Sequence, residues 1–303
     1  MTDLEQQTFY VDLVRELRAR GVICAITSGM ACVHYGIAET TKDFALLCHP
    51  GSFPTLLDFL SLTKIDGLEC HYRGNIGPPL DARWHRGGWT SHFQWDTQPD
   101  VTTLDVFGHA LRESSPWQVD IARLEASENA VAEIKRTDRD KDWPFINSLG
   151  VAMLRARDPR GWLHLSEADS VAETQAEFPI PDQMLAVRPV LELARVQDPR
   201  LRHAVLAERQ FWKELDRLRI RICRVVLRPY VVAVARAGIP KAAALLEQHA
   251  ARLVSAEGKK NPVGEYGVER TIQEARQATM AFVRPEFAQG LPDVWPHSTV
   301  LPP

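Results

Sequence analysis

The chain has 303 residues, of which 45% are hydrophobic and 25% are charged, and its formal net charge is −3. This composition is typical of a soluble globular protein with one large domain or two ordinary ones. No apolar run reaches the roughly 20 residues of a membrane-spanning helix, and the polar N-terminal segment is unlike a signal peptide. We therefore expect no membrane partner and a cytoplasmic location. The small net charge neither favours nor excludes a polyanionic partner.

The cysteine content agrees with that location. The sequence has five cysteines, an odd number, and several of them lie inside apolar segments. This pattern predicts reduced, buried thiols rather than a disulfide framework.

The first 62 residues alternate between helical and strand patterns. Phe9, Leu13 and Leu17 fall on one face of an amphipathic segment, which Gly21 ends. An apolar strand follows and breaks at the small-residue turn 27–29. The expected elements are a helix over 3–20, a strand over 22–27, a short helix over 30–35, a strand over 43–48 and a helix over 53–62.

The next segment predicts strands around a long loop. Residues 68–73 fit a strand, and residues 74–88 are rich in Gly, Pro and Arg, which is typical of a long and often functional loop. Residues 89–95 alternate between apolar and polar side chains, as a half-buried strand does. With a further strand over 101–107 they predict an antiparallel hairpin, in which Asp105 lies near the end of the second strand.

The rest of the chain is helical in pattern. Helical periodicity begins near residue 129, and we expect no strand after about residue 150. Pro144 fits the first turn of a helix. Residues 284–303 contain five prolines without periodicity and predict an extended tail.

One later helix carries two parallel stripes of side chains. An apolar stripe is formed by Leu215, Leu218, Ile222 and Val225, and a basic stripe is formed by Arg217, Arg221, Arg224 and Arg228. The helix is expected to kink or end near Pro229. The basic stripe is either a solvated face beside a core stripe or a contact for RNA or another polyanion.

Two features near the N-terminus could together carry nucleotide chemistry. The turn at Ser28 and Gly29 leaves backbone N–H groups that can hold a phosphate. Asp43 starts the following strand, and Asp105 on a later strand could converge on it. Carboxylates beside a phosphate can hold Mg²⁺, which polarises the phosphate and activates a hydroxyl. Taken alone, Asp43 is better explained as a turn or cap residue after Thr40 and Thr41.

The order of these features resembles the nucleotidyltransferase superfamily, whose best-known member is DNA polymerase β. The resemblance rests on the Ser-Gly turn, the short helix before Gly36, the T-x-D sequence at 41–43 and the L-D-V sequence at 104–106. The charged segment 135–142 is similar to a lysine-containing helical motif of the minimal and abortive-infection-toxin branch, which belongs to toxin–antitoxin systems. The resemblance covers residues 15–150.

The resemblance implies roles for individual residues. The implied nucleotide-binding residues are Ser28, Gly29, Thr41, Arg139 and Lys141, and the implied catalytic residues are Asp43, Asp105 and Lys135. Of these, Asp43 and Asp105 would bind Mg²⁺ or Mn²⁺. The alternative for segment 135–142 is a helix junction held by salt bridges.

Three positions depart from the family pattern. Ser28 stands where the family often has a glycine, and Glu39 stands where an arginine is usual. Ala45 takes the second position of the D-x-D pair, on the same face of the strand as Asp43, and its methyl group cannot bind a metal. Either the chain is a degenerate member, or its natural residue at position 45 is an aspartate. Because the other two departures are mild, the second reading is favoured at this point.

The sequence therefore predicts an α/β (α+β) fold. A small mixed sheet flanked by helices is expected over 1–150, a mostly α-helical domain over 151–283 and a Pro-rich tail over 284–303. The predicted function is transfer of a nucleoside monophosphate from an NTP to a hydroxyl acceptor, RNA being one candidate. The alternative is a catalytically inactive nucleotidyltransferase-like module that binds RNA or a protein partner.

Overall fold

The computed structural model of the chain describes residues 3–41, 44–74, 77–85, 89–108, 123–259, 265–288 and 290–291. The chain groups into two compact units. The first comprises 1–111, 115–126 and 223–265, and the second comprises 112–114, 127–222 and 266–303. These units differ from the sequence-based domains, because 127–150 group with the second unit and 223–265 return to the first.

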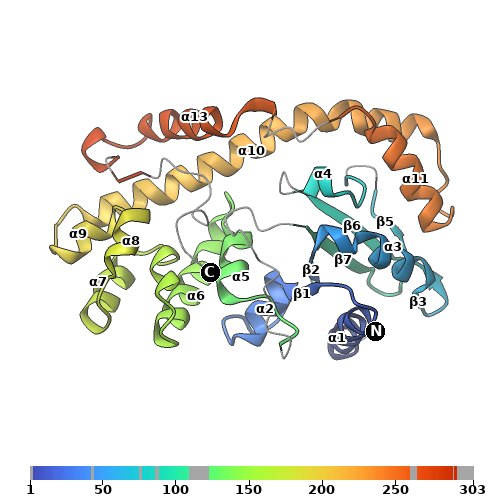
Figure 1. Cartoon of the computed structure of the whole chain (residues 1–303), viewed down its shortest axis with the longest axis horizontal. Coiled ribbons are helices and arrows are strands. Elements are labelled where there is room, and N and C mark those ends of the chain that lie inside the picture. Colours follow the sequence, from blue (N-terminus) through green and yellow to red (C-terminus); the bar gives the residue numbers. More distant parts are fainter. Residues whose placement is uncertain are drawn as a thin grey trace. The chain divides into compact units, whose positions relative to one another are not determined.

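The first unit is built on a mixed five-stranded sheet in the order β1-β2-β7-β6-β5 (Figure 1). Its strands are β1 (Cys24–Thr27), β2 (Ala45–Cys48), β5 (His71–Tyr72), β6 (Thr90–Trp95) and β7 (Thr102–Phe107). β2 pairs antiparallel with β1 and parallel with β7, while β6 pairs antiparallel with both β7 and β5. A separate ladder joins β3 (Lys64–Ile65) to β4 (Leu68–Glu69). This mixed sheet, together with the surrounding helices, confirms the expected fold class.

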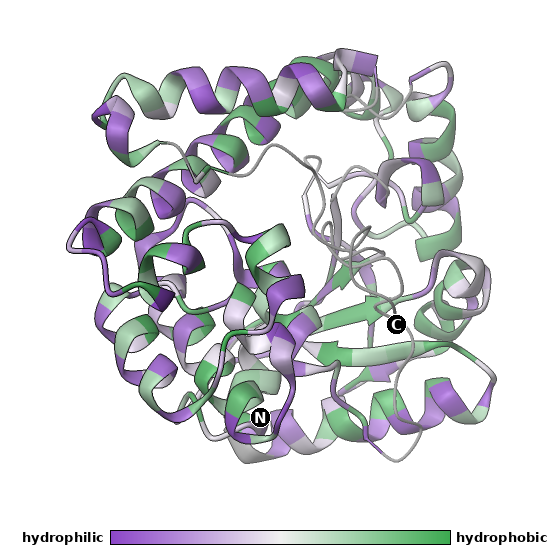
Figure 2. Ribbon diagram, turned by 60° about the vertical axis from the view of Figure 1, so that its left-hand side comes forward, coloured by the Kyte–Doolittle hydropathy of each residue, from purple (hydrophilic) through white to green (hydrophobic). Residues whose placement is uncertain are grey.

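Helices cover the sheet of the first unit. They are α1 (Asp3–Ala19), α2 (Ser28–His34), α3 (Phe53–Leu62), α4 (Ala82–His85) and α11 (Leu245–Ala256). Leu17 of α1 and Leu56 of α3 share one buried cluster with Leu46 and Val106 of the sheet. Burial of each such side chain stabilises the fold by about 1.5–3 kcal/mol. Figure 2 shows the strands mainly in the colours of hydrophobic residues.

The observed strands refine the sequence-based expectations. The hairpin of β6 and β7 is confirmed, and alternate residues of both strands are buried. Phe44 and Leu46 face the core as expected, but every residue from Phe44 to Cys48 is buried, because β2 lies inside the sheet with both faces covered. The strand expected over 68–73 is wrong as a single strand. It is divided into β4 and β5, which belong to different sheets.

The second unit is helical. Its elements are α5 (Glu128–Lys135), η2 (Asp140–Asp142), α6 (Trp143–Arg155), η3 (Pro159–Leu163), α7 (Ala168–Glu177), α8 (Asp182–Val187), α9 (Leu191–Arg195), α13 (Val268–Met280) and η4 (Pro285–Phe287). Pro144 lies in the first turn of α6, as expected. Among the described residues, no strand follows β7, which confirms the helical pattern of the later chain. In the same described part of the chain, no helix is both long and apolar enough to cross a membrane.

The long helix α10 (Leu201–Ala237) does not end at Pro229. Proline removes one backbone donor, but the side chains around it anchor the helix. Leu227, Tyr230 and Val234 are buried in one cluster with Trp84 of α4. Their burial offsets the local cost of the proline. Of the two expected outcomes, a kink or an end near Pro229, the end is therefore wrong.

The expectation of an extended tail is also wrong where the structure describes that segment. Residues 285–287 form the turn η4, and the Phe287 ring stacks on His203 with centroids 4.6 Å apart. Residues 292–303 lie outside the described part of the chain. All five cysteine side chains are buried, as the sequence predicted.

Candidate functional site

The predicted phosphate-binding turn is tightly built. Ser28 begins α2 with a φ of 58°, a left-handed conformation that few residues other than glycine adopt. A Cβ atom at Gly29 would lie 2.3 Å from Thr41 Oγ1, so only glycine fits there. The structure thus brings Gly29 and Thr41 together, and both are partly exposed. Asp43, the first predicted metal ligand, lies outside the described residues.

The second predicted ligand, Asp105, lies in a row of side chains that crosses the whole sheet. Thr27 of β1 pairs with Ala45 of β2, Ala45 pairs with Asp105 of β7, and Asp105 pairs with His92 of β6. The Arg73 N–H donates to the His92 carbonyl at 2.9 Å and extends the row to the β5 side. Directly paired residues share a face of a sheet, so these five side chains lie on one face. We call Thr27, Ala45, Asp105, His92 and Arg73 the transverse row.

The transverse row lies on the face opposite the main core. Phe44, Leu46 and Val106, which alternate with row positions along their strands, belong to the core cluster. Ala45 is only 4% exposed, and Thr27 is fully buried, its hydroxyl having no hydrogen-bond partner among the described residues. The row is therefore closed at the β1–β2 end and open to solvent from Asp105 to Arg73, whose side chains are 26% and 38% exposed.

Asp105 is held by two nitrogen donors, one from His92 on the adjacent strand β6 and one from Arg73, which directly follows β5. Its Oδ1 lies 2.9 Å from Arg73 Nη2 and 2.7 Å from His92 Nδ1. An ionised carboxylate can only accept hydrogen bonds, so the imidazole proton lies on His92 Nδ1. Arg73 Nη2 also lies 2.8 Å from His92 Nδ1. Because both nitrogens then carry hydrogens, no hydrogen bond forms between them. The positive charge of Arg73 and the imidazole N–H are both directed at the carboxylate where a metal would bind.

The described residues do not fit a two-metal site. No cluster of three or more His, Cys, Asp or Glu side chains that could hold a metal occurs among them. Ala45 offers a methyl group beside Asp105, and the bound Oδ1 of Asp105 is shared by Arg73 and His92. A pair of Mg²⁺ or Mn²⁺ ions needs several oxygen ligands, of which the described row supplies one carboxylate.

The charged segment 135–142 belongs to the second unit and is organised around Asp142. Lys135 Nζ lies 3.7 Å from Asp142 Oδ1, and Arg139 Nη2 lies 2.7 Å from Asp142 Oδ2. The Lys135 and Asp142 side chains are almost fully buried, and Lys135 also lies over the Phe145 ring. Lys141 is exposed. These contacts match the alternative that the sequence left open, a helix junction held by salt bridges.

The basic stripe on α10 is exposed but not uniformly charged. Arg217 donates to Glu214 at 2.6 Å, and Arg221 lies 3.7 Å from Glu274. Arg224 and Arg228 are exposed, and among the described residues no acidic side chain lies within ion-pair distance of them. The net positive charge of the stripe is therefore concentrated at these two arginines.

Sequence reasoning missed two residues of the site, Arg73 and His92. Arg73 is the last residue of the strand predicted over 68–73, to which no site role was given, and His92 lies on a strand whose register the spacing alone does not fix. The transverse row and the mixed sheet define the first unit as an α/β module with charged side chains on one face of its sheet. Comparisons with models of known protein families, with curated proteins and with solved structures found no match to this chain.

Proposed function

We propose that the first unit is a nucleotidyltransferase-like module that binds an NTP without transferring its nucleotidyl group. In this proposal the chain is a binding or regulatory protein. The observation that carries it is the transverse row, in which Ala45 and the Arg73–His92 pair flank Asp105 where a metal centre would need oxygen ligands.

The order and pairing of the elements support the nucleotidyltransferase-like part of the proposal. β1 leads through the Ser28–Gly29 turn into α2, β2 returns antiparallel to β1, and β7 lies parallel to β2 with Asp105 on it. This agrees with the strand, turn, helix and strand order on which the resemblance rests. Arg73 is 38% exposed in its side chain and keeps further N–H groups for a phosphate oxygen.

The contacts of Asp105 favour a degenerate site over a single inactivating change at position 45. If Ala45 alone had replaced an aspartate, Asp105 would be expected to stay free of competing cations. Instead, Arg73 and His92 compensate the Asp105 charge from the two strands that follow it across the sheet. Ala45 and the Arg73–His92 contacts with Asp105 are two separate departures from a metal site. Together they fit the loss of metal chemistry better than a single substitution at position 45 does.

An aspartate at position 45 tests the proposal. The chain, Ala45→Asp and the uncharged control Ala45→Asn are incubated with Mg²⁺, each α-labelled NTP and total cellular RNA. We expect no label transfer by any of them, because Asp105 remains paired with Arg73 and His92. Transfer by Ala45→Asp alone would contradict the proposal. It would support the competing function, an active transferase that needs only its second carboxylate and Mg²⁺.

A further inference from the structure

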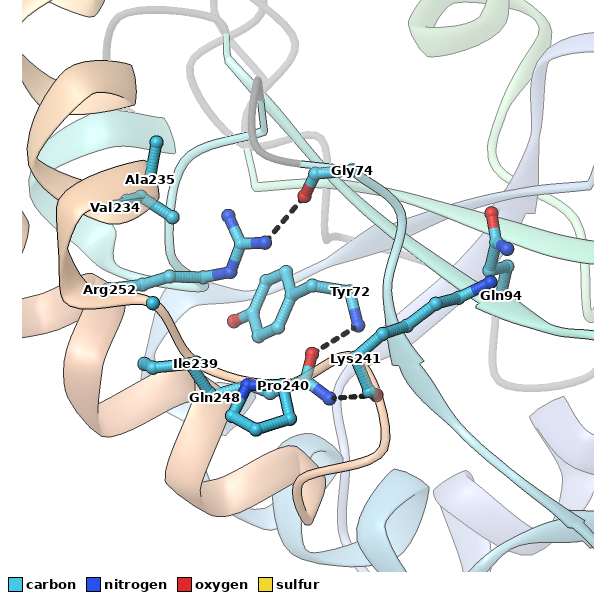
Figure 3. A pocket seen from close by; sticks show the side chains of 11 residues that line it. Tyr72, Gly74, Gln94, Val234, Ala235, Ile239, Pro240, Lys241, Gln248 and Arg252 are labelled. Atoms are coloured by element: carbon cyan, nitrogen blue, oxygen red, sulfur yellow. Dashed lines mark hydrogen bonds between the residues drawn. The ribbon is translucent and has the colours of Figure 1, made fainter.

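A pocket of about 350 Å³ lies beside the edge strand of the first unit (Figure 3). Its walls come from the end of β5, from β6, from the C-terminal end of α10 with the loop after it, and from α11. The pocket is separate from the transverse row, although Gly74 and Gln94 in its wall are close in sequence to Arg73 and His92. Its volume lies at the lower end of the range for small-molecule sites.

The most unusual residue of the pocket is Arg252. Its side chain belongs to a residue that is only 5% exposed, yet no carboxylate of the described residues lies within ion-pair distance of it. A buried charge without a counter-ion is costly, so its retention calls for a physical reason. Four interactions partly offset the cost. Nη1 donates to the Gly77 carbonyl at 3.1 Å and to the Tyr230 hydroxyl at 3.4 Å, and Nη2 donates to the Gly74 carbonyl at 2.5 Å. The guanidinium also lies 4.3 Å from the centre of the Tyr72 ring.

Those contacts orient the guanidinium without using all of its hydrogens. Nε–H and the second hydrogen of Nη2 have no acceptor among the described residues. In a planar guanidinium these two hydrogens lie on the same edge and match the two oxygens of a carboxylate or phosphate. Figure 3 shows the Arg252 side chain beside the Tyr72 ring inside the pocket.

The walls of the pocket are fixed in position by Gln248. Its Oε1 accepts from the Tyr72 N–H at 3.1 Å, and its Nε2 donates to the carbonyls of Lys241 and Ala243 at 3.1 and 2.8 Å. One buried side chain thus ties α11 to the edge strand and to the loop after α10 (Figure 3). A pocket held in this way loses little conformational entropy when a ligand binds.

A second cation lines the pocket. Lys241 Nζ is paired with Asp96 at 2.7 Å, but the two side chains are 63% and 46% exposed. Exposed pairs of this kind contribute little stability, so a ligand anion can compete for Lys241. Ile239 and Pro240 add apolar wall next to this lysine.

We propose that this pocket binds the phosphate group of a small phosphate ester, with Arg252 and Lys241 as its two cationic contacts. Arg252 holds two phosphate oxygens through its free edge, and Lys241 turns from Asp96 to a third. Two cations match the double negative charge of a phosphate monoester better than the single charge of a carboxylate. The apolar body of the ester lies against Ile239 and Pro240. This site is additional to the NTP binding proposed for the transverse row.

Binding of orthophosphate to the full chain tests the site, with titration calorimetry at low ionic strength as the measurement. Ala235 is exposed and lines the pocket, so Ala235→Phe fills the cavity without entering the core. Ala237 is exposed on the same helix end outside the lining, and Ala237→Phe is the matched control. We expect Ala235→Phe to weaken orthophosphate binding by about tenfold or more and Ala237→Phe to leave it unchanged.

A second pair of variants tests the charge without disturbing buried residues. Lys241→Gln should weaken orthophosphate binding, while Lys64→Gln, which removes another exposed lysine paired with a carboxylate, should not. Acetate provides the carboxylate arm of the experiment. No binding of orthophosphate, equal binding by Ala235→Phe and Ala237→Phe, or acetate binding as tight as orthophosphate would each overturn the proposal.

Discussion

Ala45 lies directly opposite Asp105 in the parallel pair of β2 and β7, on the same face of the sheet. A methyl group and a carboxylate are therefore neighbours at the position where the resemblance implies two carboxylates. On the other side of Asp105, His92 is its direct partner in β6. Asp105 therefore lies between the apolar side chain of Ala45 and the hydrogen-bond donor His92. These neighbours fix one carboxylate in place, and neither supplies an oxygen ligand for a metal ion.

We predict that the turn at Gly29 does not tolerate a side chain. Gly29→Ala places a methyl group against Thr41 Oγ1, and such overpacking costs about 1–3 kcal/mol. The free energy of unfolding from urea denaturation measures the loss. In the double variant Gly29→Ala/Thr41→Gly the clash is removed, so the two changes should cost less together than the sum of the single variants. Additive costs would show that the Gly29–Thr41 contact is not the cause.

The buried ion pair between Arg188 and Glu208 predicts a large effect in the second unit. Arg188 donates to both Glu208 oxygens and to the carbonyls of Trp162 and Leu165, and both charged side chains are at most 5% exposed. Arg188→Met leaves a buried carboxylate without a partner and should destabilise the protein by about 3–5 kcal/mol.

The exposed pair between Arg200 and Asp198 is the control for that prediction. Arg200→Met should leave the urea midpoint almost unchanged, because solvent replaces the lost contact. Similar losses for Arg188→Met and Arg200→Met would contradict the burial argument.

The stability of the fold should fall as the pH falls, in part because of His85. Burial lowers the pKa of His85 from its usual 6.5 to about 3, against an opposing effect of Asp81 and with a further lowering by His92. The neutral ring therefore stabilises the fold fully above pH 6.5, and this contribution is lost between pH 6.5 and pH 3 because the unfolded chain binds the proton. The loss is about 1.4 kcal/mol per pH unit for one such group.

Urea denaturation at several pH values between 7 and 4 measures this dependence. His85→Gln removes the titrating ring, while its amide can still reach the Ser91 hydroxyl, to which His85 Nε2 is bound at 3.0 Å. The slope of stability against pH should be smaller in His85→Gln than in the parent chain. An unchanged slope would show that other groups cause the acid sensitivity.

If the basic stripe on α10 contacts RNA, Arg224 and Arg228, which have no acidic partner in the described part of the chain, should carry the contact. Replacing Arg224 and Arg228 by Gln should reduce salt-sensitive RNA retention more than replacing Arg217 and Arg221, whose charges are already compensated by Glu214 and Glu274. Filter binding at two salt concentrations measures both pairs. Equal retention by all variants would favour the solvated-face reading.

The sequence was most informative where one periodicity dominates. The amphipathic segment that became α1 and the alternating strands that became β6 and β7 were recognised from spacing alone. Their hairpin also held unused information, because closing it at Trp95 and Thr102 places His92 opposite Asp105. The register of a hairpin depends on its turn, which the alternation along a single strand does not reveal.

Other features depend on contacts that spacing does not reveal. The passage of α10 through Pro229 depends on the burial of Tyr230 and Val234 against Trp84. The roles of Lys135 and Arg139 depend on Asp142, which lies close in sequence but becomes a shared partner only after the junction folds. The pocket around Arg252 joins segments about 180 residues apart, such as Gly74 and α11. Local sequence patterns therefore predict the helices and strands, whereas the positions of the site residues depend on tertiary contacts.

Equilibrium dialysis of ATP against the full chain, with one arm in Mg²⁺ and the other in EDTA, tests whether the first unit binds an NTP without a metal. The transverse row supplies Arg73 in place of a metal, so we predict that ATP binds in both arms with dissociation constants within about a factor of two. Arg73→Gln should weaken binding in both. Binding only in the Mg²⁺ arm would contradict this account, and so would binding in neither arm.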